Sequence, residues 1–424
     1  MRTPMSDLQR LLDGFDAGEL VRPYAGATGL VDVVRGAAHA CGVPDVRLTA
    51  ASRAIADHLR RADHLVFVLA DGLGIDFIDA LPRRAWLRRH MRRVIQAPYP
   101  STTPVAVASI ATGEYPARHA ITGWWTHLPA LCAPVTVFHH ERATDAVPLD
   151  RLGVGIRDLC PAPPLFPRMQ RDVALVMPVA IADSRFTRYM AGGAPCLRYA
   201  GHAEAAALIA ARITQAPGPT FTYWYTAVPD TLAHEFGTAD ARVLDAVEDL
   251  DAALDTLAVA LRGRGEEARI LVTADHGHRD VSGAGHLEVT ADDPLLALLA
   301  CPPSGDVRTL FWHVRAGAQE AFARAFRQRF GEWFLLITAA EAERIELLGP
   351  EPLGEETRRR IGDFVSIALG GEVMRYTGAP GRERFLAQRS HHSGLSAAEM
   401  LVPLIIGSAG APAREVEFPR ALRR

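Results

Sequence analysis

The chain contains no lysine and no asparagine, so all 46 residues of the lysine-plus-arginine count are arginine. A lysine Schiff base and a phosphate-binding P-loop lysine are excluded, because both depend on the lysine amine. An asparagine side chain is excluded as a metal ligand and as a donor to a developing oxyanion. The chemistry of this protein therefore proceeds without either residue.

Cysteine is scarce, and long apolar runs are missing. The five cysteines are scattered and form no CxxC pair, which predicts reduced, buried thiols rather than a disulfide framework or a thiolate metal site. The N-terminus shows no signal-peptide pattern, and no run approaches the roughly 18 apolar residues of a membrane span. We therefore expect a cytoplasmic protein without membrane contact. The cysteines are Cys41, Cys132, Cys160, Cys196 and Cys301.

The overall composition is that of an ordinary globular protein. Of the 424 residues, 49% are hydrophobic and 22% are charged, and the net charge is −3. Such a chain can bury a large core, which predicts one big α/β domain with an inserted or appended subdomain. The charge does not favour binding to a nucleic-acid polymer. The composition leaves the oligomeric state open.

Four continuous apolar runs predict buried strands. They are LVFVLAD (65–71), FTYWYTAVPD (221–230), RILVTADHG (269–277) and MLVPLIIGS (400–408). Continuous runs with β-branched residues are typical of strands that are covered on both faces, as in parallel sheets. Residues 239–265 separate the second and third runs and have apolar residues at helical spacing, which indicates a βαβ unit. The predicted fold class is α/β.

The runs also suggest a division of the chain. We expect a helical extension at 1–62 that packs on a core formed by 63–295 and 391–424. An inserted cap subdomain is predicted at 296–390, where the pattern of runs is interrupted. The proline-rich segment 124–200 has no clear period and is a candidate second insertion.

Polar residues with metal-binding side chains gather where the apolar runs end. Because the carboxyl ends of parallel strands meet at one edge of a sheet, these residues can converge there. Aspartates and histidines without cysteine favour zinc or manganese, and six or seven ligands favour two ions about 4 Å apart over one tetrahedral ion. They are Asp71, Asp230, His234, Asp275 and His276, with His391 and His392 before the fourth run.

The stretch APYPSTTPVAVASIATGEYPARH (97–119) places three hydroxyls before a small apolar helix. Ser101, Thr102 and Thr103 can cap that helix, and Pro104 suits its first turn. One of the hydroxyls can equally be a nucleophile. The local pattern leaves both interpretations open.

Five pieces of the chain together resemble the alkaline phosphatase superfamily, in particular its type I phosphodiesterase/nucleotide pyrophosphatase branch. They are VLADGLG, YPSTTPVAVASIATGEYPARHAITG, VPDTLAH, VTADHG and HSGLSAAEMLVPLI, in this order. The resemblance implies a mostly parallel central sheet flanked by helices, with a cap or insertion subdomain. It also implies two Zn²⁺ ions, with Mn²⁺ as the alternative.

The resemblance implies a role for each candidate ligand. One ion is expected at Asp230, His234 and His392, where His392 is preferred to His391 because it begins the HSGLS piece. The other ion is expected at Asp71, Asp275, His276 and the nucleophile. In the family the nucleophile lies ten residues before the glycine of the TG pair, which here is Gly113 and points to Thr103. Thr102 is the next candidate and Ser101 the third.

Two departures from the family pattern concern the substrate. Pro104 follows the nucleophile where relatives have an aromatic residue, and the asparagine that holds a phosphate oxygen is missing. A backbone amide, Thr122 or an arginine would have to replace it. Trp124 and Trp125 can stack on a flat leaving group or belong to the cap core. His278 can orient a ligand or lie on the surface, and His286 is also near the metal loop.

The predicted function is a metal-dependent hydrolase of phosphodiester or nucleotide pyrophosphate bonds that works through a phosphothreonine intermediate. Its partner is a small phosphate ester or nucleotide. A phosphomonoesterase or a phosphonate C–P hydrolase is the alternative on the same scaffold, and a binding module without activity is the non-enzyme alternative. A phosphoglycerate mutase is disfavoured because the chain has no lysine. A sulfatase is disfavoured because its cysteine or serine motif is missing around 101–107.

Overall fold

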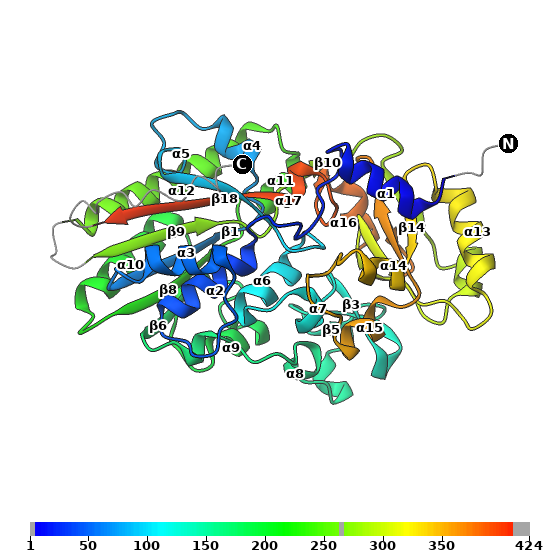
Figure 1. The fold of residues 1–424 in the computed structure, drawn as a ribbon, viewed down its shortest axis with the longest axis horizontal. Helices are drawn as coiled ribbons and strands as arrows, with labels where there is room; N and C mark the ends of the chain where they lie inside the picture. Colours follow the sequence, from blue (N-terminus) through cyan, green and yellow to red (C-terminus); the bar gives the residue numbers. More distant parts are fainter. Residues whose placement is uncertain (1–4, 263–266, 410–424) are drawn as a thin grey trace.

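The computed structural model describes residues 5–262 and 267–409, and it contains two large sheets that lie side by side (Figure 1). The first sheet has the strand order β2-β18-β9-β1-β8-β6-β7. Its members are β1 (His64–Ala70), β2 (Met91–Gln96), β6 (Asp172–Pro178), β7 (Cys196–Tyr199), β8 (Thr220–Thr226), β9 (Ala268–Thr273) and β18 (Leu401–Ala409).

The first sheet is largely parallel, as the apolar runs predict. Strand β1 pairs in parallel with β8 and β9, and β6 pairs in parallel with β7 and β8. All seven residues of β1 and of β8 are buried, which explains why both strands are continuous apolar runs. The fourth run forms β18, which is antiparallel to both β9 and β2. The N-terminal end of β18 therefore lies at the edge where β1, β8 and β9 end.

The second sheet is antiparallel and combines two distant parts of the chain. Its order is β14-β15-β13-β12-β3-β4-β5. Its strands are β3 (Trp125–Leu128), β4 (Ala133–Thr136), β5 (Glu141–Arg142), β12 (Ser304–Asp306), β13 (Thr309–Trp312), β14 (Phe334–Thr338) and β15 (Phe364–Ala368). Two small pairs, β10 (Arg279–Asp280) with β17 (Ser390–His391) and β11 (His286–Val289) with β16 (Val373–Tyr376), complete the described strands.

Helices flank the first sheet in two groups. Helix α2 contacts α3 and α6, and α12 contacts α4, α5 and α10. The βαβ helix predicted at 239–265 is observed as α12 (Ala241–Ala260), and 263–266 lie outside the described residues. The other members are α2 (Leu30–Ala40), α3 (Ala50–Leu59), α4 (Ile75–Ala80), α5 (Trp86–His90), α6 (Thr103–Thr112) and α10 (His202–Gln215). The remaining α-helices are α1 (Asp7–Asp16), α7 (Pro116–His119), α8 (Ile156–Leu159), α9 (Arg185–Ala191), α11 (Asp230–Phe236), α13 (Gln319–Phe330), α14 (Ala339–Arg344), α15 (Glu355–Ile361), α16 (Arg382–Ala387) and α17 (Ala397–Met400).

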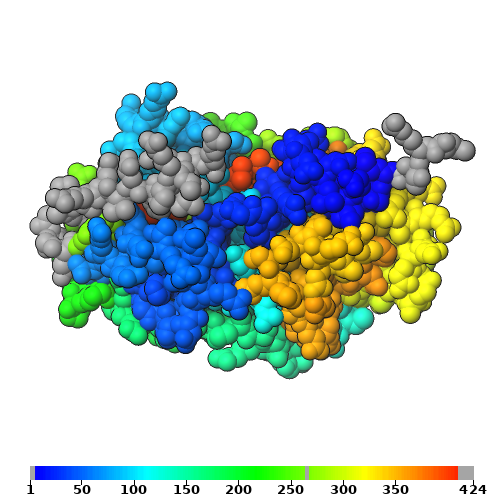
Figure 2. Space-filling view, viewed as in Figure 1, coloured from blue at the N-terminus to red at the C-terminus, as the bar shows by residue number. Residues whose placement is uncertain are grey.

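The predicted segment boundaries differ from the division into sheets. From the candidate insertion 124–200, only β3, β4 and β5 join the second sheet, while β6 and β7 belong to the first. The N-terminal extension contacts both sheets: α2 packs in the core of the first, whereas α1 packs on β14 of the second. Figure 2 shows these N-terminal residues in blue, extending over both halves of the molecule. Residues 410–424 of the predicted core lie outside the described residues.

Among the described residues, no helix is both long enough and apolar enough to cross a bilayer.

Candidate metal centre

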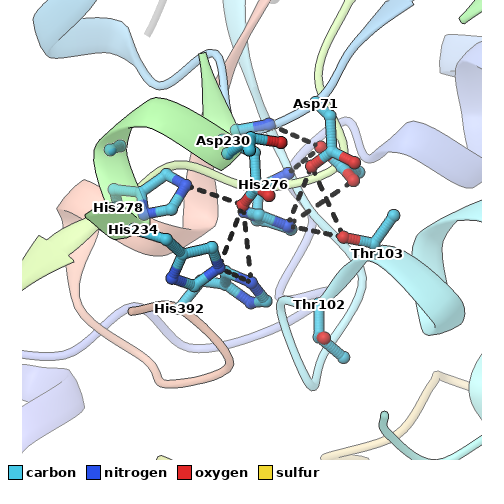
Figure 3. Close-up of polar contacts among 12 residues, drawn as sticks. Asp71, Thr102, Thr103, Asp230, His234, His276, His278 and His392 are labelled. Carbon is cyan, nitrogen blue, oxygen red and sulfur yellow. Dashed lines mark hydrogen bonds and ion pairs between the residues drawn. The ribbon is translucent and has the colours of Figure 1, made fainter. Parts of the chain in front are cut away.

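Three neighbouring strands of the first sheet deliver the candidate ligands to one edge. Asp71 directly follows β1, and Asp275 with His276 follow β9 shortly after its end. Asp230 begins α11 just after β8. Because β9, β1 and β8 are adjacent and parallel, their carboxyl ends bring these side chains together. Figure 3 shows Asp71, Asp230 and His276 converging on one site with His234 and His392.

The first group of ligand atoms consists of Asp71, Asp275 and His276, which lie within 4.8 Å of one another. His276 Nε2 is 3.4 Å from Asp71 Oδ1 and 3.5 Å from Asp275 Oδ2. The other ring nitrogen, Nδ1, lies 3.0 Å from the Gly277 carbonyl, to which it can only donate. Nε2 then keeps its lone pair. Asp275 Oδ2 is buried without a hydrogen-bond partner, so this group fits a cation.

The second group consists of Asp230, His234 and His392. The Nε2 atoms of the two histidines are 3.3 Å apart, and they lie 3.3 and 3.7 Å from Asp230 Oδ1. Each Nδ1 faces a backbone carbonyl, that of Ser390 for His234 and that of Ser101 for His392. Both Nδ1 atoms therefore donate, and the two Nε2 lone pairs point at one another. A cation between them removes that repulsion, so the second group also fits a metal ion.

The three hydroxyls of the STT stretch have different partners, and Figure 3 shows the hydroxyl of Thr103 in contact with Asp71 and His276. Ser101 donates to the Gly394 carbonyl at 2.8 Å, and Thr102 donates to Asp306 Oδ2 at 2.6 Å. Thr103 Oγ1 lies 3.1 Å from His276 Nε2 and 3.4 Å from Asp71 Oδ1. Thr102 is the N-cap residue of α6, but its side chain makes no capping hydrogen bond. Of these hydroxyls, that of Thr103 faces the first ligand group.

The acidic side chains interact strongly because they are buried together. Burial and the neighbouring carboxylates of Asp275 and Asp230 raise the pKa of Asp71 well above its ordinary value. Burial also acts to raise the pKa of Asp230, but His234 and His278 outweigh it and hold that pKa well below the ordinary value. Tyr225 donates its hydroxyl to Asp71. Two dications would neutralise the like charges that raise the pKa of Asp71.

Glycine is required in the turn that carries Asp71. Gly72 has φ +74°, a region that other residues rarely adopt. A Cβ atom there would lie 2.7 Å from His278 Nε2 and 2.9 Å from the Cα of Asp230. The amide of Gly72 donates to Asp275 Oδ1 at 3.0 Å. The DG dipeptide thus allows the turn and lets α11 approach β1 closely.

His278 is buried and orients a candidate ligand. Its Nε2 lies 2.9 Å from Asp230 Oδ1, and its Nδ1 lies 3.0 Å from the Ser390 hydroxyl. The alternative of a surface position is therefore wrong. His286 bonds to the Gln388 carbonyl and belongs to none of the metal-binding groups found among the described residues.

A cavity of about 240 Å³ opens over Thr103 and the second ligand group, Asp230, His234 and His392. Trp124 and Trp125 line it, as the stacking hypothesis requires. Thr122 does not line it; its hydroxyl is buried and has no hydrogen-bond partner, so the structure does not support Thr122 as the replacement for the missing asparagine. His391 lines the cavity next to His234 but belongs to neither ligand group.

Sequence reasoning missed four charged residues of this cavity: Glu141, Asp306, Arg375 and Arg384. Asp306, from the end of β12, accepts the hydrogen bond of Thr102, and Arg375, from β16, lies with its guanidinium 4.7 Å from the ring centre of Trp125. Both come from the second sheet or its neighbouring strands, far from the sequence motifs. A basic residue within an apolar strand segment such as VMRY was the only local signal.

The expectation for the cysteines is wrong in part. Cys41, Cys160 and Cys301 are buried, but Cys196 is half-buried and Cys132 is exposed. All five are free thiols.

Comparison with known proteins identifies the family. Residues 65–319, more than half of the chain, match the family described as type I phosphodiesterase/nucleotide pyrophosphatase. The chain therefore belongs to this metal-dependent family, within the alkaline phosphatase superfamily. No curated protein sequence matches the chain.

Solved structures with a similar fold include enzymes of two kinds. Human ectonucleotide pyrophosphatase/phosphodiesterase 5 is 14% identical with a TM-score of 0.59, and covers 82% of this chain and 88% of its own. An inactive variant of the murine protein, in complex with AMP, is 16% identical with a TM-score of 0.57. The match covers 82% of this chain and 87% of the murine chain. Phosphonoacetate hydrolase from Sinorhizobium meliloti, in complex with phosphonoformate, is 19% identical with a TM-score of 0.57. The match covers 84% of this chain and 92% of the hydrolase chain. At these identities the likeness shows the fold.

Proposed function

We propose that this protein is a two-metal hydrolase that cleaves phosphodiester or nucleotide pyrophosphate bonds through a covalent phosphothreonine at Thr103. The observation that carries the proposal is the position of the Thr103 hydroxyl, within 3.4 Å of both Asp71 and His276, beside a second ligand group. Family membership supports the reaction class. The presence of both ligand groups and of the hydroxyl argues against a binding module without activity.

The proposed centre has one ion at Asp71, Asp275, His276 and Thr103, and a second at Asp230, His234 and His392. When bound, Zn²⁺ or Mn²⁺ would lower the pKa of the Thr103 hydroxyl and place positive charge beside the phosphoryl oxygens of the substrate. Histidine nitrogens with carboxylate oxygens are a donor set that suits these metals.

The chain's own groups account for the rest of the reaction. The Thr103 hydroxyl loses its proton and its oxygen attacks phosphorus, which forms the phosphothreonine and releases the leaving group. Water then cleaves that ester. Thr103 is the first residue of α6, so the amides and the positive dipole end of this helix face a phosphate held beside it. His278 holds Asp230 in place through the hydrogen bond described above.

The substrate is proposed to be a small molecule that the cavity encloses. Trp124 and Trp125 offer flat faces for a base or another flat group. Arg375 offers a positive charge to a second anionic group. AMP bound to the murine relative supports a nucleotide, and phosphonoformate bound to the bacterial hydrolase supports a small phosphonate as the second candidate. A cytoplasmic location stays a prediction.

Chelation and a panel of substrates test the proposal. We expect activity to disappear after chelator treatment and to return with Zn²⁺, with bis-p-nitrophenyl phosphate cleaved faster than p-nitrophenyl phosphate. Release of p-nitrophenol and of phosphate from phosphonoacetate would be measured in parallel. Faster cleavage of the monoester would place the protein among phosphomonoesterases, and exclusive cleavage of phosphonoacetate among phosphonate hydrolases. A reconstituted protein that cleaves none of the three would contradict the proposal.

Arg375 is expected to recognise a charged group beyond the reacting phosphate. The substitution Arg375→Met removes the charge but keeps an apolar stem against Trp125. A hydrogen bond to a charged group contributes about 1.5–3 kcal/mol, so KM for a nucleotide pyrophosphate or phosphonoacetate should rise roughly tenfold or more. KM for bis-p-nitrophenyl phosphate, which has no second charge, should hardly change.

A matched control is Arg382→Met. Arg382 is exposed, pairs with Glu288 and does not line the cavity. Equal KM changes for all substrates in Arg375→Met would show that Arg375 does not recognise the second anionic group of the substrate. The same selective change in Arg382→Met would show this as well.

A further inference from the structure

A third group of metal-binding side chains lies in and beside the second sheet, outside the catalytic cavity. His127 belongs to β3, Cys301 precedes β12, and His313 directly follows β13. One ligand atom from each residue lies within 4.8 Å of the other two. None of the three residues lines the cavity over Thr103. The backbone holds them together, because the Ala300 amide donates to the His313 carbonyl at 2.8 Å.

The spacing of His127 and Cys301 matches two ligands of one tetrahedral ion. Their Nδ1 and Sγ atoms are 3.6 Å apart. Zinc bonds of about 2.0–2.1 Å to nitrogen and about 2.3 Å to sulfur, at a tetrahedral angle, place two such atoms about 3.5 Å apart. The imidazole ring of His313 lies over that of His127, with 3.8 Å between the ring centres.

His313 has a lone pair that no group among the described residues uses. Its Nε2 lies 3.1 Å from the Arg359 carbonyl, which can only accept a hydrogen bond, so Nε2 carries the proton. Nδ1 is then an acceptor, and it is buried without a hydrogen-bond partner. Metal-binding histidines commonly donate one nitrogen to a backbone carbonyl and offer the other to the ion. His313 has this arrangement with the second atom still unpaired.

The two imidazole rings are tilted by 31° to one another. His127 is buried and His313 is half-buried. Burial lowers the pKa of both rings, which favours the neutral form that binds metals.

Cys132 is the candidate for a fourth ligand, although it is exposed and is not part of the group whose ligand atoms lie within 4.8 Å of one another. It follows the short 3₁₀ helix Pro129–Leu131, and its Sγ lies 3.9 Å from the Ala300 carbonyl. Burial, and then the adjacent Cys132 thiol, raise the pKa of Cys301 to about 12. Binding of a shared cation would convert both thiols to thiolates whose protons leave to solvent.

We propose that His127, Cys301 and His313, with Cys132 as the fourth ligand, bind a structural Zn²⁺ ion. Two cysteines and two histidines are a donor set of closed, tetrahedral zinc sites that have no catalytic position. The ion joins β3 to the segments around β12 and β13. Trp125 lies two residues before His127 and thus on the same face of β3, so the ion also fixes this wall of the cavity.

Cobalt substitution of the full-length protein tests the site, because only a sulfur ligand produces thiolate-to-cobalt charge-transfer absorption in the near ultraviolet. The aspartates and histidines of the catalytic centre cannot produce it. We expect the band in the wild type and its loss in Cys301→Ser, together with the loss of one metal equivalent per chain in elemental analysis of the zinc form. Cys196→Ser, which removes a thiol on β7, should keep both. A wild type without the band would overturn the proposal.

Two further measurements test whether a metal-free variant is merely misfolded and whether the two cysteines form a disulfide. His313→Gln keeps both thiols and should lose the same metal equivalent while its circular dichroism stays native; unchanged metal content would contradict the site. Thiols are then counted in wild-type protein that was denatured with chelator and without reductant. We expect five reactive thiols, and a count of three would mean that Cys132 and Cys301 form a disulfide instead. Neither result depends on which substrate the catalytic centre cleaves.

Discussion

Thr103→Ala is expected to lose roughly 10⁴-fold or more of the hydrolytic activity, measured as kcat on the substrate that the wild type cleaves fastest. Removal of a catalytic nucleophile has effects of this size in hydrolases that form a covalent intermediate. The Thr103 hydroxyl is the one in the STT stretch that faces Asp71 and His276. Thr103→Ser keeps a hydroxyl and should retain a substantial share of the activity.

Thr102→Val is the matched control, because it removes a neighbouring hydroxyl of the same helix start. That hydroxyl donates to Asp306 and does not reach either ligand group, so activity should stay within about tenfold. Zinc content should be measured for every variant, to separate loss of the nucleophile from loss of the ions. Full activity in Thr103→Ala together with an inactive Thr102→Val would transfer the nucleophile to Thr102.

Arg308→Met is expected to lower the free energy of unfolding by about 3–5 kcal/mol, since it leaves a fully buried carboxylate unpaired. The Arg308 Nε atom donates to Glu399 Oε1 at 2.6 Å, and both side chains are at most 1% exposed. The same guanidinium donates to the carbonyls of Glu372 and Gly370. Urea unfolding followed by tryptophan fluorescence would measure the change.

The pair also supports the loop that carries His392. The Arg308 amide donates to the Ser393 hydroxyl at 3.1 Å, and Glu399 Oε1 accepts from the Gly394 amide at 2.7 Å. We therefore expect Arg308→Met to weaken zinc binding as well. Arg358→Met is the control, because its ion pair with Glu343 is largely exposed and should contribute at most about 1 kcal/mol. Equal stability losses in both variants would contradict a special role for Arg308.

Acid should weaken the ion pair between Arg308 and Glu399. Burial acts to raise the pKa of Glu399, but Arg308 and the hydrogen bonds from Ser396 and Gly394 outweigh it and hold the pKa below the ordinary 4.5. A depressed carboxyl pKa contributes stability that is present above the ordinary pKa and is lost as the pH falls through the folded-state value. The wild type should therefore lose this contribution below about pH 4.5, and Arg308→Met should lose less over the same range.

The amino-acid sequence by itself predicted four of the seven strands of the first sheet (β1, β8, β9 and β18) and the placement of the candidate ligands at their ends. Strands buried on both faces must be continuous apolar runs, and LVFVLAD, FTYWYTAVPD and RILVTADHG follow that rule. A polar residue that ends such a run must lie at the sheet edge, so Asp71, Asp230 and Asp275 could be placed together before the structure was known. These signals are local, because each of them is contained within one short stretch of the chain.

Only the tertiary structure decided which side chains meet across long separations. The spacing implied by the family resemblance pointed to Thr103, but only the structure shows that the Thr103 hydroxyl faces Asp71 and His276 while that of Thr102 donates to Asp306. The second sheet joins β3 to β12, which lie far apart in the chain, so no continuous stretch of sequence contains its strand pattern. Arg375 reaches the cavity from the small β11–β16 pair, and His127 of the second sheet meets Cys301, which precedes β12. Contacts of this kind depend on packing between segments, which local propensity and periodicity do not encode.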